Sequence, residues 1–451
     1  MNEELETVFE EIKTLLAGKQ YAALSQYVRE LKPADIALLF EDISREDVTL
    51  LFRLLPKDTA ADTFVELEPE RQQQLIDAFS DTELKAVLDE LYLDDTVDII
   101  EEMPANVVRR IIRYSSPEMR KSINEILNFP ANSAGSIMTI EFIDLNAKMT
   151  VDQAFEHIRT TGWDKETIYT CYVIGADRRL QGVVTVQQML LCDRSLKIGD
   201  IMDKNVISCK TTDDKVDVAH MLDKYDFLAL PVVDHEDRLV GIVTIDDAID
   251  VLTEDATEDI EKMAAILPIE KTYLRTGIFE TWKQRIPWLL LLMLSSTFTQ
   301  KIINSAETAL SACVALTAFI PMLMDTGGNA GGQVSVTVIR GLSLGEISFS
   351  DWLHVLWKEM RVSLLCGFTL AFANFIKLLT FDHVTLTVAA VVCITLLVAV
   401  IFAKIVGCLL PIAAKRVGFD PAVMASPFIT TIVDSLTLLT YFQVARMLLH
   451  I

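Results

Sequence analysis

The sequence predicts a multidomain membrane protein with an all-α superhelical N-terminal domain, an α/β pair, an acidic connecting helix and an α-helical membrane domain of five spans. Two observations predict this order. The hydrophobic period changes along the chain, from helical to strand-like and then to long apolar runs that occur only after about residue 282. The charge is also uneven: residues 1–275 hold 29 Lys and Arg against 55 Asp and Glu, whereas residues 276–451 hold 11 against 9. An acidic soluble part is therefore followed by a nearly neutral membrane part. A negative field of this size excludes nucleic acid as a partner and concentrates cations.

Residues 1–130 are predicted to form the helical domain. Apolar residues recur at three- and four-residue intervals, and similar units begin at Ala34, Ala60 and Leu84, 24 to 26 residues apart. Such repeats bury their apolar faces only by stacking, which favours a superhelix. The acidic start lacks a basic region and an apolar core, so we expect no cleavable signal peptide and a cytoplasmic N-terminus.

Residues 131–252 contain two similar halves. In each, an apolar strand, a turn rich in Asp and Arg, a second strand entered through glycine and a helix start follow one another. This pattern resembles the paired cystathionine-beta-synthase (CBS) motif, a β-α-β-β-α unit that binds adenine nucleotides or metal ions. The second half ends as Gly241, Thr244 and Asp247, as that motif does, but the first half has Gln188 in place of the acid.

The CBS resemblance implies one site for ATP or another adenine nucleotide. Tyr169 and Phe227 would stack on the adenine, and Thr244 and Asp247 would lie near the ribose or phosphates. Core packing explains both aromatic residues equally well.

The last part, residues 281–451, is predicted to cross the bilayer five times, with about 20 apolar residues needed for each span. Basic residues at the ends of the spans place the N-terminal side in the cytoplasm, so an odd number of spans puts Ile451 outside the cell membrane. The predicted spans are 286–303, 309–339, 362–380, 384–414 and 423–449.

Two features of the apolar runs indicate a cation pathway. Residues 321–340 form a glycine-rich, polar interruption, and backbone outside regular helices is tolerated at that depth only when it is buried in protein or lines water. Asp434 lies inside the last span, where a charged side chain is costly and usually functional. Asn329, with carbonyl groups exposed by its glycine neighbours, would add oxygen ligands, and Pro421 and Pro427 would free further carbonyl groups. Few carboxylates and several neutral oxygens suit Mg²⁺, which dehydrates reluctantly.

The order of these parts resembles the MgtE-type magnesium channels over nearly the whole chain. The most specific stretches are P-M-L-M-D-T-G-G-N-A-G-G-Q from Pro321, Y-D-F-L-A-L-P-V-V-D from Tyr225 and F-D-P-A-V-M-A-S-P-F-I-T-T-I-V-D from Phe419. The resemblance implies a homodimer. Asp325 departs from the family pattern, which has a small residue there, and is either an extra pore carboxylate or a salt-bridge partner.

Carboxylates gather where the CBS pair meets the acidic connecting helix, predicted over residues 253–280. Like charges packed closely repel one another, and bound Mg²⁺ would reverse the sign of that term. We therefore expect a feedback gate in which high cytosolic Mg²⁺ bridges the domains and closes the pore. The candidate ligands are Asp94, Asp95, Asp226, Asp246, Asp247, Asp250, Glu254, Asp255, Glu258 and Asp259. A solvated surface is the alternative for each acid taken singly.

Other functions stay open at this stage. A CBS-regulated channel for Mn²⁺ or Co²⁺ is the nearest alternative, because selectivity depends on cavity size and ligand number. An intramembrane aspartyl protease is a weaker one: residues 325–327 read D-T-G, and Asp325 could pair with Asp434. We expect that the protein is not an enzyme.

Overall fold

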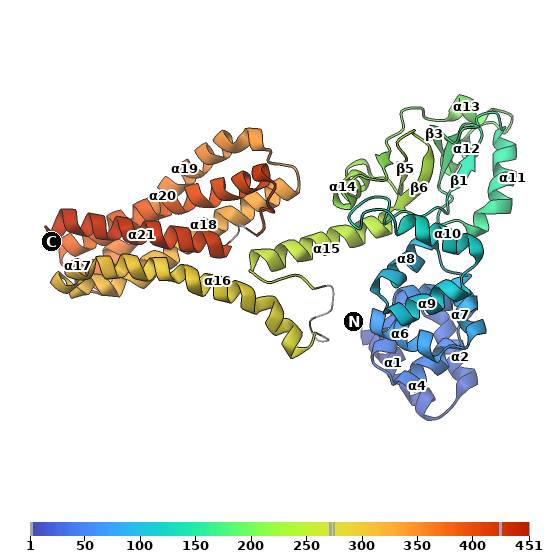
Figure 1. Ribbon diagram of the computed structural model, residues 1–451, viewed down its shortest axis with the longest axis horizontal. Coiled ribbons are helices and arrows are strands. Elements are labelled where there is room, and N and C mark those ends of the chain that lie inside the picture. The colour runs from blue at the N-terminus through green and yellow to red at the C-terminus, as the bar shows by residue number, and fades with distance from the viewer. Residues whose placement is uncertain (1–2, 270–272, 274–275, 424–425, 451) are drawn as a thin grey trace. The chain divides into compact units, whose positions relative to one another are not determined.

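The computed structural model describes residues 3–269, 273, 276–423 and 426–450, which form two compact units (Figure 1). The first unit ends at Thr253 and the second begins at Glu254.

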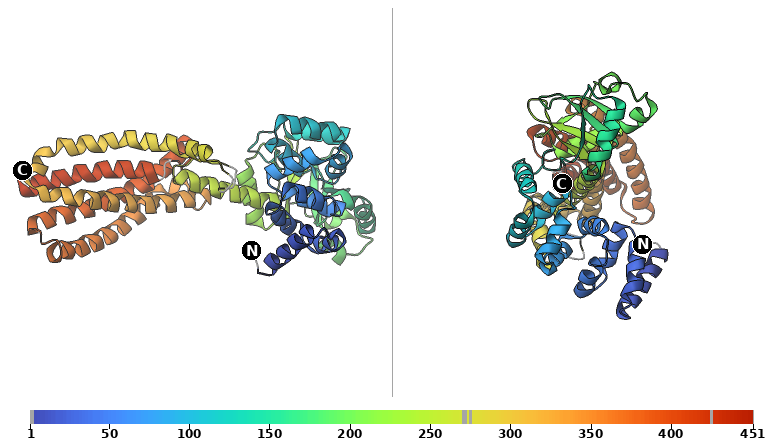
Figure 2. Two further views of the ribbon diagram at one scale, coloured as in Figure 1. Left: turned by 90° about the horizontal axis from the view of Figure 1, so that it is seen from below. Right: turned by 90° about the vertical axis from the view of Figure 1, so that its right-hand side faces the viewer.

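The first unit begins with ten short helices. Ser44, Ser80 and Ser116 start three of them by accepting a hydrogen bond from a backbone N–H of the first turn. Helix α3 packs on α5, and α5 packs on α7, so the repeats predicted from the sequence contact one another in turn. The helices are α1 Glu3–Ala17, α2 Tyr21–Glu30, α3 Pro33–Glu41, α4 Arg45–Phe52, α5 Lys57–Val65, α6 Pro69–Ala78, α7 Asp81–Leu88, α8 Leu93–Glu102, α9 Ala105–Tyr114 and α10 Pro117–Ile126. Figure 2 shows these helices from two further sides.

Two small sheets follow, and they confirm the predicted pair of similar halves. In each sheet the first strand pairs in parallel with the second, and the second pairs antiparallel with the third. The first half contains β1 Ile143–Leu145, α11 Val151–Thr161, β2 Thr170–Ile174, β3 Leu180–Thr185, α12 Val186–Leu191 and α13 Ile198–Ile201. The second contains β4 Cys209–Lys210, α14 Lys215–Tyr225, β5 Ala229–Val233 and β6 Leu239–Thr244.

The hydrophobic core of the ten helices continues into the second half. Buried Ile100 and Ile123 of the helices belong to the same cluster as Leu230 and Val243 of β5 and β6. The loop before β2 also reaches the helices, because the Tyr92 hydroxyl donates a hydrogen bond to the Lys165 carbonyl at 3.5 Å. The first unit therefore holds the N-terminus of α8 against the CBS pair.

The acidic connecting helix differs from its predicted bounds. Helix α15 runs over Ile245–Met263, so it starts directly after β6 and ends well before residue 280. Of the rest of the predicted connecting segment, residues 270–272 and 274–275 lie outside the described residues, as does Ile451.

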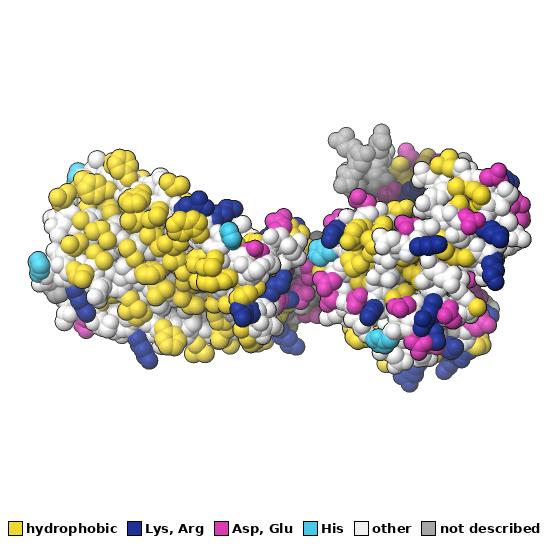
Figure 3. Space-filling view, turned by 90° about the horizontal axis from the view of Figure 1, so that it is seen from above, with side chains coloured by type: hydrophobic (Ala, Val, Ile, Leu, Met, Phe, Trp, Pro, Cys, Tyr) yellow, Lys and Arg dark blue, Asp and Glu magenta, His cyan; other side chains and the backbone are white. Residues whose placement is uncertain are grey.

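The second unit is a helical bundle whose surface is covered with hydrophobic side chains (Figure 3). Helix α20 lies in its middle and packs against α18, α19 and α21, while α16 packs mainly on α21. The elements are α16 Ile278–Ser305, α17 Glu307–Ala312, η2 Val314–Phe319, α18 Ile320–Ser343, η3 Phe349–Asp351, α19 Trp352–Thr380, α20 Leu386–Val417 and α21 Ser426–Leu449.

Among the residues that the structure describes, four helical segments are long and apolar enough to cross a membrane: Ile278–Ser305, Phe349–Thr380, Leu386–Val417 and Pro427–Leu449. The five predicted spans are therefore not confirmed. Helix α18 would be about 36 Å long at 1.5 Å per residue, which is sufficient. Because α18 contains polar and glycine residues, its mean hydropathy is too low for it to count among the four apolar segments.

The backbone of the glycine-rich segment was predicted wrongly. Residues 321–340 lie within the continuous helix α18, and the irregular stretch comes earlier, at η2. The carbonyl groups near Asn329 are therefore in a helix and are not freed by the glycines. Pro427 lies in the first turn of α21. Backbone N–H groups in the first turn of a helix have no carbonyl partner within the helix, so a proline there does not free a carbonyl group.

Candidate cation pathway and cytosolic acidic cluster

The glycines of α18 let it pack closely against two neighbouring helices. A Cβ atom at Gly331 would lie 2.8 Å from the Ile429 side chain and 3.2 Å from the Ala403 carbonyl oxygen. On α20, a Cβ atom at Gly407 would collide with the Gly331 carbonyl group. Close backbone approach through small residues is typical of membrane helix pairs. The glycines therefore serve helix packing.

The other face of α18 is polar. Asp325, Asn329, Gln333 and Thr337 follow one another at four-residue intervals, and all four are exposed in the single chain. We call these four residues the α18 stripe. They line a cavity of about 970 Å³ together with Asp434. The predicted residues Asp325, Asn329 and Asp434 are thus brought to one cavity, and the stripe adds Gln333 and Thr337, which the four-residue spacing in the sequence could have revealed.

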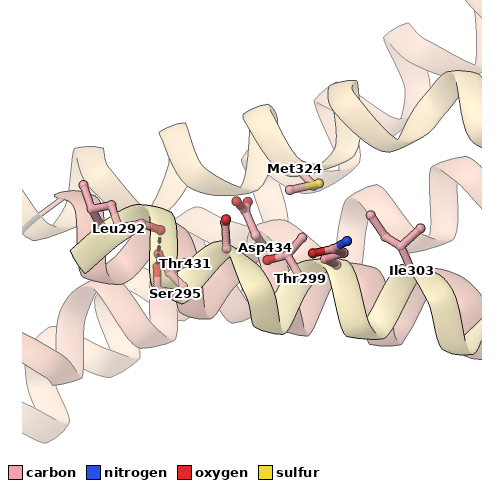
Figure 4. A pocket seen from close by; sticks show the side chains of 9 residues that line it. Leu292, Ser295, Thr299, Ile303, Met324, Thr431 and Asp434 are labelled. Carbon is pink, nitrogen blue, oxygen red and sulfur yellow. Dashed lines mark hydrogen bonds between the residues drawn. The ribbon is translucent and has the colours of Figure 1, made fainter. Parts of the chain in front are cut away.

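Asp434 of α21 is poorly satisfied within the bundle. Its Oδ1 atom is buried and accepts no hydrogen bond from any residue that the structure describes. A buried carboxylate oxygen without a partner is costly unless a cation or proton compensates for it. Asp434 also lines a second cavity, of about 340 Å³, on the side of α16 (Figure 4).

The bundle also contains an ion pair that the sequence analysis did not predict. Lys404 of α20 and Glu359 of α19 are both largely buried and form an ion pair of 3.4 Å. Because each compensates for the other, this pair differs from Asp434, and neither residue lines the two cavities.

In the first unit, α8 carries carboxylates into a crowded acidic cluster. Asp94 is 6% exposed and Asp95 is half-buried, so these first-turn residues do not form a solvated face. Asp246 and Asp247, in the first turn of α15, act electrostatically on Asp95. We call Asp94, Asp95, Asp246, Asp247 and Glu166 the α8 cluster.

The pKa values in the α8 cluster are raised. Burial, followed by the charge of Asp247, holds the pKa of Asp94 well above its ordinary value and raises the pKa of Asp95 to about 7. Burial also raises the pKa of Asp247 to about 6, although a hydrogen bond from the Thr244 hydroxyl, at 2.5 Å, opposes the shift. The folded unit therefore holds these carboxylates together at an electrostatic cost.

Glu166 is the member that sequence reasoning missed. Burial and then the charge of Asp246 raise its pKa to about 8, and its Oε2 atom is buried without a hydrogen-bond partner among the described residues. Its backbone N–H donates to the Glu141 carbonyl at 2.9 Å, which fixes the loop before β2. Glu166 belongs to the first CBS half and is far from α8 in sequence, so only the fold brings it there.

The remaining predicted acids lie elsewhere. Asp226 is exposed at the C-terminal end of α14, with a left-handed backbone (φ 53°). Asp250, Glu254 and Asp255 lie along α15.

The C-terminal part of α15, from Glu254 to Met263, belongs to the second unit. There the Lys262 ammonium group pairs with Glu258 at 2.7 Å and with Asp420 at 2.6 Å. Burial, followed by the charges of Asp255 and Asp420, raises the pKa of Asp259 to about 6.

No three His, Cys, Asp or Glu side chains among the described residues are arranged to hold a metal ion directly. An ion at the α8 cluster would therefore need side chains to move, or water between it and the carboxylates. The latter suits Mg²⁺, which keeps several water ligands.

The residues predicted to bind a nucleotide differ in how free their side chains are to do so. The Tyr169 side chain is 65% exposed and free to stack, whereas Phe227 is half-buried and already stacks on Tyr225 at 5.6 Å between ring centroids. The Thr244 hydroxyl is committed to Asp247, and Asp247 belongs to the α8 cluster. Tyr169 thus fits a nucleotide best, and Asp247 fits an anionic phosphate poorly.

Comparison with known families agrees with this division of the chain. Residues 320–444 match the family described as divalent cation transporter, residues 31–132 match the MgtE intracellular N domain, and residues 198–254 match the CBS domain. The fold and its sites thus define a divalent cation transporter with a CBS-containing cytosolic part.

Curated relatives identify the family. The chain is 36% identical to the magnesium transporter MgtE of Thermus thermophilus over 95% of both chains. It is 31% identical to the magnesium transporter MgtE of Bacillus subtilis over 94% of this chain and 93% of that one. The chain belongs to the MgtE family of magnesium transporters. Members of this family are transporters and not enzymes, so the protease alternative is wrong.

Solved structures resemble the cytosolic part. The cytosolic domain of the Mg²⁺ channel MgtE, crystallised in complex with ATP, is 32% identical and covers 54% of this chain and 99% of its own, with a TM-score of 0.52. The soluble part of a magnesium transporter is 30% identical and covers 56% of this chain and 99% of its own, with a TM-score of 0.53.

Proposed function

We propose that this chain conducts Mg²⁺ into the cell across the cell membrane, along a path that passes the carboxylate of Asp434. The observation that carries the proposal is the unpartnered Oδ1 atom of Asp434, buried beside a polar cavity in an apolar bundle. Asn329 and Thr430 supply neutral oxygens in the same cavity. Asp325 lines this cavity too, and two carboxylates with several neutral oxygens suit a cation that crosses largely hydrated. The inward membrane potential would drive it.

A homodimer would complete this path. In a single chain the α18 stripe is exposed, and polar side chains on a membrane helix are costly when they face lipid. A second copy related by a two-fold axis would place two stripes opposite each other around water. One chain per particle in native mass spectrometry of the detergent-purified protein would contradict this assembly.

Five spans remain part of the proposal, with α18 as the fifth span beside the four apolar segments. With the N-terminus in the cytoplasm, the C-terminus is then outside. The proposed domains are residues 1–130, 131–252, 253–280 and 281–451, the first forming a stacked helical superhelix.

The cytosolic part would sense Mg²⁺ and close the pore. The raised pKa values of Asp95 and Glu166 support this, because they mark carboxylates whose repulsion a divalent cation would relieve. High cytosolic Mg²⁺ would neutralise the α8 cluster and the acids of α15 and favour the closed state. When Mg²⁺ falls, repulsion would favour the open state, a population shift driven by differential binding.

An adenine nucleotide is proposed as a second ligand of the CBS pair. The similar cytosolic domain that contains ATP supports this, as does the exposed ring of Tyr169. We assign stacking to Tyr169 and Phe227. Thr244 and Asp247 could contribute only if their mutual hydrogen bond opened.

Uptake of Mg²⁺ by a magnesium-starved strain that lacks its own transporters tests the pathway. We expect Asp434→Asn and Asp434→Ala to reduce uptake at least about tenfold, because removing the charge removes the main attraction for a divalent cation at that depth. Asp382→Asn is the matched control, since Asp382 pairs with Lys377 near the end of α19 and lines neither cavity. Undiminished uptake by Asp434→Asn at equal membrane abundance would exclude the pathway. Competition by Mn²⁺ and Co²⁺ in the same assay decides whether another divalent cation is preferred.

A further inference from the structure

Asp434 is shared by two cavities. The larger one lies along the α18 stripe, and the smaller one, of about 340 Å³, is a groove bounded by α16, α18 and α21 and open on one side. Met324 is the other residue that lines both. We call the smaller cavity the α16 chamber. It shares one carboxylate and one flexible thioether side chain with the cavity of the proposed path.

The hydroxyl groups around the α16 chamber are arranged to accept hydrogen bonds. Ser295 donates its proton to the Leu292 carbonyl at 2.8 Å, and Thr431 donates to the Pro427 carbonyl at 3.0 Å. Ser296 likewise donates to its own helix, at 2.7 Å. Ser295 and Thr431 also share a hydrogen bond of 3.3 Å, in which either hydroxyl can be the donor. Each hydroxyl has one proton, so once that proton is committed to the backbone or to the neighbouring hydroxyl, only lone pairs remain for the chamber.

Two further polar groups of α16 complete the lining. The side chains of Thr299 and Gln300 make no hydrogen bond to any residue that the structure describes, and both line the chamber. In Figure 4 Thr299 lies next to Asp434, between Thr431 and Ile303. The chamber therefore holds one anionic group and several uncharged acceptors, and no basic residue lines it.

This lining matches the outer surface of a hydrated divalent cation. Water bound to such an ion presents its protons outward, so it needs acceptors, and Mg²⁺ gives up its water reluctantly. Six waters at about 30 Å³ each occupy about 180 Å³, which the chamber can contain. The unpartnered Oδ1 atom of Asp434 supplies the charge that such an ion needs.

We propose that the α16 chamber is a second position for a hydrated divalent cation, held through its waters by Ser295, Thr299 and Gln300 and sharing Asp434 with the conduction path. This inference rests on the proposed function. One carboxylate cannot compensate fully for two dications, so occupation of the chamber weakens the hold of Asp434 on the ion in the path. Conduction needs such weak, multiple binding, because an ion must leave as readily as it enters.

Proteoliposomes that contain the full-length chain test this, with the initial rate of Mg²⁺ uptake measured against external Mg²⁺. We expect Thr299→Val and Ser295→Ala each to lower the half-saturating concentration about three- to tenfold, because each removes one hydrogen bond to the ion's water, and an emptier chamber lets Asp434 hold the ion in the path more tightly. Thr299→Ser keeps the hydroxyl and should restore the wild-type value. Thr297→Val is the control, because Thr297 is exposed on the same helix, bonds to the Leu294 carbonyl and does not line the chamber.

Each outcome decides something. Unchanged half-saturation in Thr299→Val and Ser295→Ala, with uptake still lost in Asp434→Asn, would overturn the chamber and leave the path standing. Uptake that persists in Asp434→Asn would instead remove the proposed function itself. A shift in Thr299→Val that Thr299→Ser shares would also contradict the proposal, because it would show that side-chain volume and not the hydroxyl matters.

Discussion

Asp434 shows how much a single side chain can indicate about a membrane protein. Its charge and its place in an apolar run are visible in the sequence, and the structure adds that one oxygen is buried without a partner. Lys404 and Glu359 are equally charged and more buried, yet they compensate for each other at 3.4 Å. The sequence could not distinguish these cases, because pairing between α19 and α20 depends on how the helices face one another. A charge without a partner needs compensation from elsewhere, whereas a paired charge does not.

Tyr169 carries the residue-scale prediction for the nucleotide. Because its ring is 65% exposed, removing it should cost little stability but should remove one stacking surface. We expect Tyr169→Ala to weaken ATP binding to the full-length chain about tenfold, measured by titration calorimetry. Trp163→Ala is the matched control, since Trp163 is an exposed aromatic residue of the same half. Equal affinities for wild type and Tyr169→Ala would show that Tyr169 does not stack on the adenine.

At the scale of elements, the sequence predicts helices and strands with a clear hydrophobic period better than elements whose residues also serve close packing between helices. The short helices before residue 130 and the strands of both CBS halves follow from periodicity and turn residues. Helix α18 was predicted as an interruption because four glycines usually break helices. Its glycines are retained for close contact with α20 and α21, which exists only after folding. The bounds of α15 also differ from the prediction, because the helix that starts directly after β6 continues without a break into the acidic connecting segment.

Helix α8 carries the element-scale prediction, which concerns pH. The folded-state pKa values of Asp95 (about 7) and Glu166 (about 8) lie above the unfolded values near 4. For such acids the stabilising contribution is fully present below about pH 4 and is lost as the pH rises through the folded-state pKa values. Without divalent cations, we therefore expect the free energy of unfolding of residues 1–253 to fall by about 1 to 3 kcal/mol between about pH 5 and about pH 8.

Thermal unfolding of that fragment, with and without Mg²⁺, measures this effect. Residues 1–253 form one compact unit of the chain, so this fragment is suitable for the measurement. Mg²⁺ should reduce the loss at high pH, and Asp95→Asn should flatten the pH dependence. Asp77→Asn, on the exposed surface of α6, is the control. A Tm that stays constant from about pH 5 to about pH 8 would show that the cluster is not strained.

At the scale of the whole molecule, charge divides the chain into a strongly acidic part and a nearly neutral part. All of the net negative charge lies before residue 276, and the α8 cluster and all acids of α15 lie within that part. The membrane unit is nearly neutral, and Asp434 is the one carboxylate lining both of its cavities. A protein that both senses and conducts one ion needs sites of different strength. The five carboxylates of the α8 cluster would bind a dication more tightly than the two that line the path cavity, and an ion in the path must be held loosely enough to be released.

The proposed gate can be tested on the full-length chain. If Mg²⁺ favours one arrangement of the cytosolic part, protease access should change with Mg²⁺ at constant ionic strength, because screening alone would act on all surface charges alike. We expect millimolar Mg²⁺ to slow tryptic cleavage at least about threefold, and the double substitution Asp94→Asn, Asp95→Asn to resemble the Mg²⁺-bound protein, since both remove repulsion in the α8 cluster. NaCl matched in ionic strength is the control. If the fragments and their rates are the same in Mg²⁺ and in matched NaCl, the acidic cluster does not control the pore, and its pKa shifts would have to reflect the packing of α8 alone.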